Sequence, residues 1–197
     1  MAVTILRCTG GEVERYLPDA ARLRIEVFRE FPYLYDGTME GERKGLAVYA
    51  RSPLSVFVLA VADGEVVGVS TGLPLADAGE AHQAPFREAG WNLAEVFYFG
   101  ESVVRREFRG GGLGQRFFDE REAHAARHGF KVTAFCAVDR EPDHPLCPEH
   151  YQALDRFWER RGYRREHGMV VALSWPQVDT GGEVENRLTF WTRRLDR

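Results

Sequence analysis

Apolar residues along this chain follow two spacings, one typical of strands and one typical of helices. Short apolar runs predict strands at Val3–Arg7, Val56–Ala62, Glu65–Leu73, Val96–Val104, Lys131–Val138, Tyr163–Trp175 and Arg187–Leu195. Apolar residues that recur every three or four positions predict helices over residues 17–28, about 38–50, Leu113–His128 and Tyr151–Arg161. This interleaved order predicts an α/β fold of the mixed α+β kind, in a single domain over residues 1–197.

Turn-forming residues support these boundaries. Asp63-Gly64 separates two apolar runs and predicts a two-residue hairpin turn. Gly129 and Gly162 directly follow predicted helices, where glycine commonly ends a helix in a left-handed conformation. Residues 75–92 are rich in alanine, glycine and polar side chains and predict an inserted segment, whereas the prolines of residues 139–149 predict an irregular loop.

The composition argues against several classes of protein. Apolar residues make up 44% and charged residues 28% of the 197 residues, which is ordinary for a globular domain. A net charge of −4 argues against a general nucleic-acid-binding protein, which would carry a basic excess. Three cysteines do not indicate a disulfide framework and favour a reducing compartment. No segment has the pattern of a signal peptide or the length of a transmembrane helix, so we expect a cytoplasmic protein with no membrane partner.

The segment 103–116 carries the clearest chemical signal. Gly110, Gly111, Gly112 and Gly114 lie between a predicted strand and a predicted helix, and such a turn exposes the first backbone amides of the helix. These amides and the positive end of the helix dipole attract anions, phosphate above all. Four arginines in the segment oppose one glutamate, and the acids of the helix begin only after its first turn. The segment therefore predicts an anion-binding cradle.

Two common phosphate-binding motifs do not fit this segment. A P-loop requires a lysine followed by serine or threonine after its last glycine, whereas Gln115 follows Gly114. A dinucleotide-binding motif requires Gly-x-Gly-x-x-Gly. Counted from Gly110 its last position is Gln115, and counted from Gly112 it is Phe117.

The pattern that fits is Arg/Gln-x-x-Gly-x-Gly/Ala, present as Arg109-x-x-Gly112-x-Gly114. It resembles motif A of the GNAT-type N-acetyltransferases, in which the turn and the helix N-terminus hold the pyrophosphate of acyl-coenzyme A. Arg106 stands where the family usually has a proline. The resemblance implies a central mixed, mostly antiparallel sheet flanked by helices, with acetyl-CoA as the cofactor. It further implies coenzyme contacts from Val103, Val104, Arg109, Gly110, Gly111, Gly112, Leu113, Gly114 and Gln115.

A second resemblance to the same family lies at Phe157–Tyr163, which matches the Leu-Tyr-x-x-x-Gly-Phe half of motif B. Trp158 stands at the position of a tyrosine that protonates the leaving thiolate in many relatives, which implies that Trp158 contacts the coenzyme. An indole N–H does not titrate near neutral pH, so Trp158 is not expected to act as the acid. Either another group serves or water supplies the proton. A non-catalytic acyl-CoA-binding sensor is the alternative function.

Glu101 is the candidate general base. It is an acid within the otherwise apolar run Val96–Val104, near the expected position of the thioester, and partial burial would make it a better proton acceptor. A solvated or ion-paired carboxylate is the alternative interpretation. Tyr98 is the second catalytic candidate, and strand alternation predicts that it lies on the opposite face of the strand.

Phe28, Tyr33 and Tyr35 lie at the junction of the first two predicted helices. In relatives this region covers the acceptor site, so these rings are candidates for the wall of an amine pocket, where cation–π attraction would act. Ordinary packing in the core and loop is the alternative.

The remaining histidines carry weaker signals. His144-x-x-Cys147-x-x-His150 has the spacing of metal ligands, but the prolines of this loop make it rigid without a metal, and we expect none. His124 and His128 lie on a predicted helix and are expected at the surface.

These observations predict an acetyl-CoA-dependent N-acetyltransferase. We expect it to transfer an acetyl group to a primary amine of a small molecule or protein by direct attack in a ternary complex. Pairing through the C-terminal strand would give a homodimer.

Overall fold

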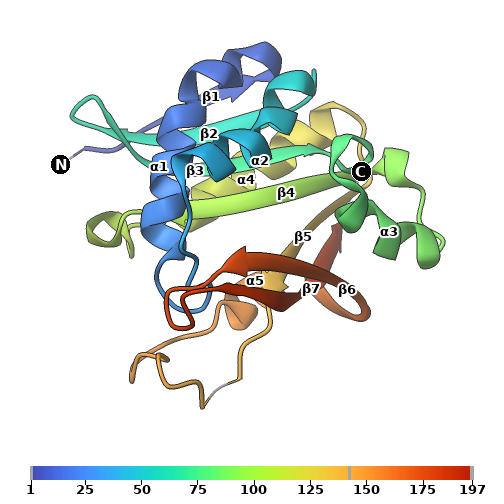
Figure 1. The fold of residues 1–197 in the computed structure, drawn as a ribbon. Helices are drawn as coiled ribbons and strands as arrows, with labels where there is room; N and C mark the ends of the chain where they lie inside the picture. Colours follow the sequence, from blue (N-terminus) through green and yellow to red (C-terminus); the bar gives the residue numbers. More distant parts are fainter. Residues whose placement is uncertain (1, 142, 196–197) are drawn as a thin grey trace.

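A seven-stranded sheet forms the centre of the structure, a computed structural model that describes residues 2–141 and 143–195 (Figure 1). The strands follow the order β1-β2-β3-β4-β5-β7-β6. Their bounds are β1 (Thr4–Thr9), β2 (Val56–Ala62), β3 (Glu65–Pro74), β4 (Val96–Val104), β5 (Val132–Val138), β6 (Arg164–Pro176) and β7 (Glu183–Arg194). Neighbouring strands are antiparallel except β4 and β5, which are parallel. The predicted mixed, mostly antiparallel sheet is therefore confirmed.

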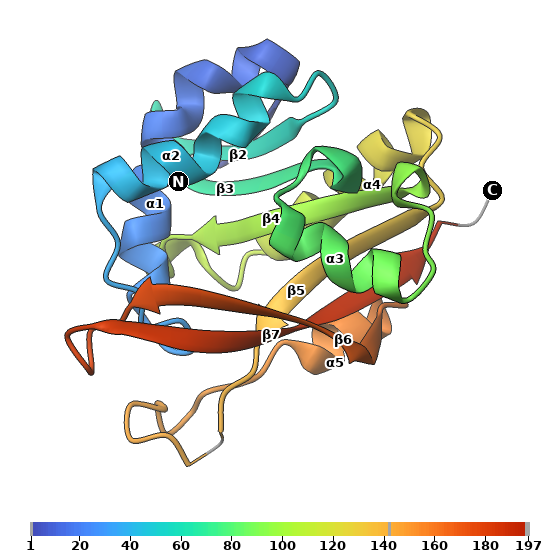
Figure 2. The same cartoon turned by 45° about the vertical axis from the view of Figure 1, so that its right-hand side comes forward.

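Helices cover both faces of this sheet (Figures 1 and 2). The α-helices are α1 (Leu17–Phe28), α2 (Met39–Arg51), α3 (Glu80–Glu88), α4 (Leu113–Arg127) and α5 (Asp155–Arg160). Short 3-10 segments are η1 (Gly10–Tyr16), η2 (Leu75–Asp77), η3 (Leu93–Glu95) and η4 (Arg106–Phe108). Helices α1, α2 and α3 pack on one face, and α4 and α5 pack on the other. Among the described residues, no helix is both long and apolar enough to cross a membrane.

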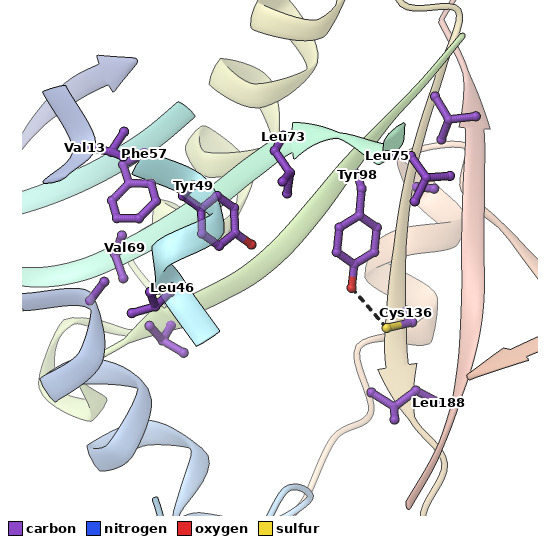
Figure 3. Packing of buried hydrophobic residues seen from close by; sticks show 14 of the residues in the cluster. Val13, Leu46, Tyr49, Phe57, Val69, Leu73, Leu75, Tyr98, Cys136 and Leu188 are labelled. Carbon is purple, nitrogen blue, oxygen red and sulfur yellow. Dashed lines mark hydrogen bonds between the residues drawn. The ribbon is translucent and has the colours of Figure 1, made fainter. Parts of the chain in front are cut away.

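Alternation along the strands creates two apolar layers. On β4, Phe97 and Phe99 face α4, and Phe99 meets Phe118 of that helix edge-on at 5.8 Å between ring centroids. Tyr98 points to the opposite layer, whose packing is shown in Figure 3. In that layer Tyr49 of α2 meets Phe57 of β2 edge-on at 5.4 Å. Each helix therefore buries its apolar stripe against one face of the sheet.

The glycine turns behave as the sequence predicted. Asp63 and Gly64 both have positive φ angles, 49° and 83°, which is the geometry of a tight hairpin between two twisted strands. Gly129 and Gly162 follow α4 and α5 with φ angles of 79° and 84°. Only glycine adopts these values without a steric cost, which explains its presence at both helix ends.

Two predicted boundaries were wrong by four residues, whereas the others differ by two residues or fewer. α5 begins at Asp155 rather than at Tyr151, because the Tyr151 ring packs edge-on against Phe31 at 4.7 Å and keeps the preceding chain in a loop. β7 begins at Glu183 rather than at Arg187, because residues 183–186 continue the antiparallel ladder opposite residues 173–176. Backbone pairing extends this strand beyond its apolar run.

Residues 75–92 form η2, α3 and the turn before β4. Figure 2 shows α3 in front of the sheet, near β5 and β7. Phe86 of α3 is fully buried and meets Phe190 of β7 edge-on at 4.9 Å. The segment thus adds a wall to the face that α1 and α2 cover. That it is an insertion in the family fold stays a prediction.

His124 contradicts the expectation of a surface position. Its side chain lies in the interface between α4 and the sheet at 2% exposure, whereas His128 is exposed. The Nε2 atom lies 2.9 Å from the carbonyl oxygen of Leu54, which a neutral imidazole can satisfy as a donor. Burial lowers the pKa of His124 to about 4, against the weaker opposing effect of that hydrogen bond.

We expect the free energy of unfolding to fall as the pH decreases from 7 to 5. The unfolded chain binds a proton at His124 with an ordinary pKa of about 6.5, whereas the folded chain resists protonation down to about 4. Stability is therefore fully present above the unfolded pKa, and by pH 5 the loss is on the order of 1–2 kcal/mol.

Urea unfolding of the wild type and of His124→Gln at both pH values measures this loss. The variant should lose less stability between the two pH values. His128→Gln, on the same helix, is the control and should keep the wild-type dependence. Equal pH dependence in all three proteins would contradict the assignment.

Candidate active site

The glycine turn after β4 has the geometry of an anion cradle. Gly110 and Gly112 have φ angles of 84° and 80°, and Gly112 is the residue directly before α4. No described side chain caps the first amides of α4, and no acid lies in the first turn of this helix. A Cβ atom at Gly111 or Gly114 would meet no described atom within 4 Å, so internal packing does not require glycine there. The turn therefore leaves open space in front of free backbone donors.

Two of the arginines that flank the cradle are already ion-paired, so they contribute less free positive charge than the sequence suggested. Arg109 donates to both carboxylate oxygens of Glu30, at 2.8 and 3.2 Å, and its Nε donates to the carbonyl of Val104 at 2.9 Å. Arg105 similarly binds Glu65 at 2.8 Å. The acids that neutralise these arginines come from the turn after α1 and from β3. Among the described residues near the turn, the exposed Arg106 and Arg116 remain as side chains without an acidic partner.

β4 and β5 separate halfway along β4. Their parallel pairing covers only Val96–Tyr98 opposite Val132–Ala134, and the two strands then diverge (Figure 1). The second half of β4, which includes Val103 and Val104, runs from this fork to the glycine turn. Its edge toward β5 is free of described strand partners. An extended ligand can therefore lie along it in place of a strand.

A β-bulge in β4 turns Glu101 toward the α1–α2 face. Gly72 pairs with Phe99 and Ser70 pairs with Ser102, so β4 has one extra residue between these pairs. The extra residue reverses the alternation of side chains. Tyr98 and Glu101 consequently line the same cavity, and the prediction that they lie on opposite faces was wrong.

Arg121 of α4 supports the bulge from the other face. This arginine is 1% exposed and donates to the carbonyls of Thr71 and Glu101 at 3.1 and 3.3 Å, and to Ser102 Oγ at 2.8 Å. Burial lowers the pKa of Arg121 to about 10, so it stays charged at neutral pH. The bulge also requires Gly100, because a Cβ there would collide with the Tyr49 hydroxyl and with Thr71 Oγ1.

Glu101 belongs to a buried ion cluster, hereafter the triad Glu42–Arg24–Glu101. Glu42 and Glu101 are 2% and 6% exposed, and Arg24 lies between them. Arg24 Nη1 donates to Glu101 Oε2 at 2.7 Å, and its Nε donates to Glu42. Burial alone would lower the pKa of Arg24, but the two carboxylates raise it above its ordinary value. Glu101 Oε1 is buried and receives no hydrogen bond from the described residues.

The sequence carried a signal for this triad. Arg24 continues the buried stripe Ala20–Ala21 of α1, and Glu42 begins the stripe of α2 that includes Leu46 and Tyr49. A charged residue at a position where the pattern expects an apolar one must find a buried partner. The partner itself could not be identified, because α1, α2 and β4 meet only in the folded chain.

Tyr98 and Cys136 form the polar floor of the cavity beside the fork. The Tyr98 hydroxyl lies 3.2 Å from Cys136 Sγ, as Figure 3 shows. Burial raises the pKa of Tyr98 well above its ordinary value and raises that of Cys136 to about 11. Both groups therefore stay protonated at neutral pH.

The predicted aromatic residues also line the cavity, whose volume is about 600 Å³. Phe28 and Tyr33 pack at 4.3 Å between ring centroids, and Trp175 of β6 lies 6.1 Å from Tyr33. The indole of Trp175 donates to the carbonyl of Tyr33 at 3.1 Å, which fixes the loop after α1. Tyr35 lines the cavity as well, and burial raises its pKa to about 12. Sequence reasoning missed Trp175, His82 and Cys136, which the fold brings from other elements.

A family model described as the acetyltransferase (GNAT) family matches residues 21–163, which is more than half of the chain. This chain belongs to the GNAT acetyltransferase family. It is therefore an acyltransferase of a family that uses acetyl-CoA as the acyl donor. No functionally curated protein matches it.

Solved structures share the fold of this GNAT chain at low sequence identity. A protein of Acinetobacter baylyi assigned as an acetyltransferase is 14% identical at a TM-score of 0.63, with 99% of this chain and 93% of that chain covered. A Salmonella typhimurium protein, likewise assigned and solved with its cofactor acetyl-CoA, is 16% identical at 0.62, with 100% and 96% covered. A ribosomal-protein-alanine N-acetyltransferase of Brucella melitensis is 16% identical at 0.61, with 98% and 99% covered.

Trp158 lies in an aromatic cluster on the α4–α5 face of this GNAT domain. Its indole packs against Phe135 at 5.0 Å and against Trp191 at 5.2 Å between ring centroids. Trp158 does not line the cavity that holds Glu101 and Tyr98. Its predicted contact with the coenzyme stays a prediction.

The loop with metal-like spacing is organised by other contacts. His144 Nε2 lies 3.5 Å from Asp179 Oδ2, and the imidazole lies 5.7 Å from the Phe31 ring. In residues 2–141 and 143–195, no group of three or more His, Cys, Asp or Glu side chains is arranged to hold a metal ion.

Arg24→Met should lower the free energy of unfolding by about 2–4 kcal/mol, because it leaves Glu42 and Glu101 buried without a counter-charge. Arg22→Met is the matched control on the same helix. Its ion pairs are exposed, so its loss should cost less than about 1 kcal/mol. Urea unfolding at pH 7 measures both values. Equal effects of the two substitutions would contradict the described burial of the triad.

Proposed function

We propose that this GNAT protein transfers the acetyl group of acetyl-CoA to a primary amine, with both substrates bound in one ternary complex. The observation that carries the proposal is the buried Glu101 carboxylate, which lines the aromatic cavity and whose Oε1 has no hydrogen-bond donor among the described residues. The same strand leads from Glu101 directly to the glycine turn. Glu101 thus lies nine residues before Gly110, the first glycine of the cradle.

The cradle residues fit the coenzyme. The backbone amides of Gly110–Gln115 would hold its pyrophosphate, and the exposed Arg106 and Arg116 would add positive charge. The free edge of β4 around Val103 and Val104 would lie along the pantetheine arm, whereas the paired side chain of Arg109 would stabilise the turn from behind. When bound, acetyl-CoA supplies an acetyl group activated as a thioester.

Glu101 would receive the proton that the attacking amine loses. A carboxylate within hydrogen-bond reach of the nitrogen can serve as a general base. Arg24 and the packed bulge hold Glu101 in one orientation, which positions it for this role. Phe28, Tyr33 and Tyr35 would enclose the acceptor.

Tyr98 is the proposed donor of the proton that the leaving thiolate of the coenzyme takes up. Its hydroxyl lines the cavity and lies next to the Cys136 thiol. Trp158, at the usual tyrosine position, has no titratable proton near neutral pH. Tyr98 or water would therefore protonate the sulfur that leaves.

The cavity chemistry favours direct attack over an acyl-enzyme intermediate. Cys136 is the cysteine among the described cavity-lining residues, and burial raises its pKa to about 11. A thiol of this kind is a weak nucleophile at neutral pH. Three free cysteines also support the predicted reducing, cytoplasmic compartment.

Gly112→Asp should weaken acetyl-CoA binding in calorimetric titration by roughly tenfold or more, because it adds a negative charge where the pyrophosphate approaches. Gly112→Asn is the matched control. It has the same shape at the same φ of 80° but no charge, so it should bind better than the Asp variant. Unchanged affinity in a folded Gly112→Asp protein would remove the cradle from the proposal.

Glu101→Gln should lower kcat by about 100-fold or more and leave the Kd of acetyl-CoA within about twofold. Glu95→Gln, which removes an exposed carboxylate just before β4, is the control and should keep wild-type kinetics. Wild-type turnover of Glu101→Gln at every pH would exclude Glu101 as the base. Acetyl-CoA binding by the wild type without turnover on any amine would instead support the sensor.

A further inference from the structure

We propose that the acceptor of this enzyme is a primary amine with an apolar body and no carboxylate next to the amine, and that the triad Glu42–Arg24–Glu101 makes this selection. The inference rests on the proposed acetyl transfer and names the class of its acceptor. It follows from the charge of the triad, from the use of the Arg24 donors and from the walls of the cavity.

The triad gives the cavity a net negative charge. One guanidinium is shared by two carboxylates, so the three side chains together carry −1. Glu101 Oε1 is a buried acceptor atom that no described residue satisfies. His82 also lines the cavity, but burial lowers its pKa, so it is neutral at pH 7. A bound ammonium group would supply both the missing hydrogen bond and the missing positive charge.

Arg24 has no pair of guanidinium nitrogens that are both free to bind a carboxylate. Its Nε and Nη1 already donate to Glu42 and Glu101, and its guanidinium lies 5.1 Å from the centroid of the Phe28 ring. The other charged groups that line the cavity are the exposed Arg51 and Asp77, which have opposite signs. A carboxylate beside the amine would thus lie close to Glu101, whose own cation Arg24 is already shared by two carboxylates, and like charges at such a distance are strongly disfavoured.

The walls of the cavity are apolar and aromatic. Phe28, Tyr33 and Trp175 form one side, and leucines of α2, β3, β6 and β7 contribute further apolar surface. The volume of about 600 Å³ lies in the range of sites that enclose small organic molecules. Aromatic rings also attract a cation near their faces. An aryl-alkyl or alkyl primary amine matches all three features.

Three amines with the same aromatic ring test the proposal. 2-Phenylethylamine and L-phenylalaninamide are cations, whereas L-phenylalanine carries a carboxylate beside its amine. We expect the wild-type kcat/KM for each cation to exceed that for L-phenylalanine by roughly tenfold or more. Spermidine, a cation without an apolar body, should be a poorer acceptor than 2-phenylethylamine.

Glu42→Gln is the variant that separates selection from catalysis. Glu42 does not line the cavity, and glutamine preserves an acceptor for Arg24 while it removes one negative charge. The kcat/KM ratio of 2-phenylethylamine to L-phenylalanine should fall by about fivefold or more, since Arg24 then carries charge that a carboxylate can use. Glu40→Gln, an exposed acid on the same helix, is the control and should keep the wild-type ratio.

Each outcome decides a different point. Equal or better use of L-phenylalanine by the wild type, a preference for spermidine, or an unchanged ratio in a folded Glu42→Gln protein would overturn the proposed selection and leave acetyl transfer standing. Turnover of none of the four amines, with acetyl-CoA bound, would count against the acceptor class. Transfer to a peptide N-terminus in that case would keep the proposed function and discard this inference.

Discussion

The contacts of Arg121 with the bulge in β4 determine the geometry of the site. The guanidinium donates to two backbone carbonyls and a hydroxyl at the point where β4 has one residue more than β3. The extra residue turns Glu101 to the same face as Tyr98. Just before it, β4 also leaves β5, which frees the strand edge that leads to the glycine turn. One buried side chain thus supports both the cavity and the approach to the cradle.

Positive and negative charge are separated along β4. At its C-terminal end lie uncapped backbone amides and two exposed arginines, where we propose that an anion binds. On the opposite side of the bulge, two carboxylates share one arginine and leave the cavity negative. Separate regions of opposite charge would suit the proposed binding of an anionic coenzyme on one side and of a cationic acceptor on the other. The ion pairs of Arg105 and Arg109 with acids of α1, of the turn after it and of β3 stabilise the glycine turn rather than enlarge its positive charge.

Much of the fold could be predicted from the sequence because its signals are local. The Asp63-Gly64 hairpin, the glycines that end α4 and α5, and the cradle at Gly110–Gly114 each depend on a few neighbouring residues. The element boundaries that were predicted wrongly depend on contacts with residues far away in the sequence. The ring of Phe31 holds Tyr151 outside α5, and the ladder with β6 lengthens β7. The predicted surface position of His124 was wrong for the same reason, because His124 is buried only once the sheet packs on α4.

By itself, the sequence determined the order of elements and the glycine turn after β4, and it suggested the candidates Glu101, Phe28, Tyr33 and Tyr35, because periodicity and turn chemistry act over a few residues. Only the tertiary structure decided that a bulge places Tyr98 and Glu101 on one face, and that Arg24 and Glu42 accompany Glu101. A single extra residue in a ladder leaves no local pattern, since it is defined by the partner strand. Buried charges likewise acquire their partners only when distant helices pack together, because a charge without a partner is too costly to bury.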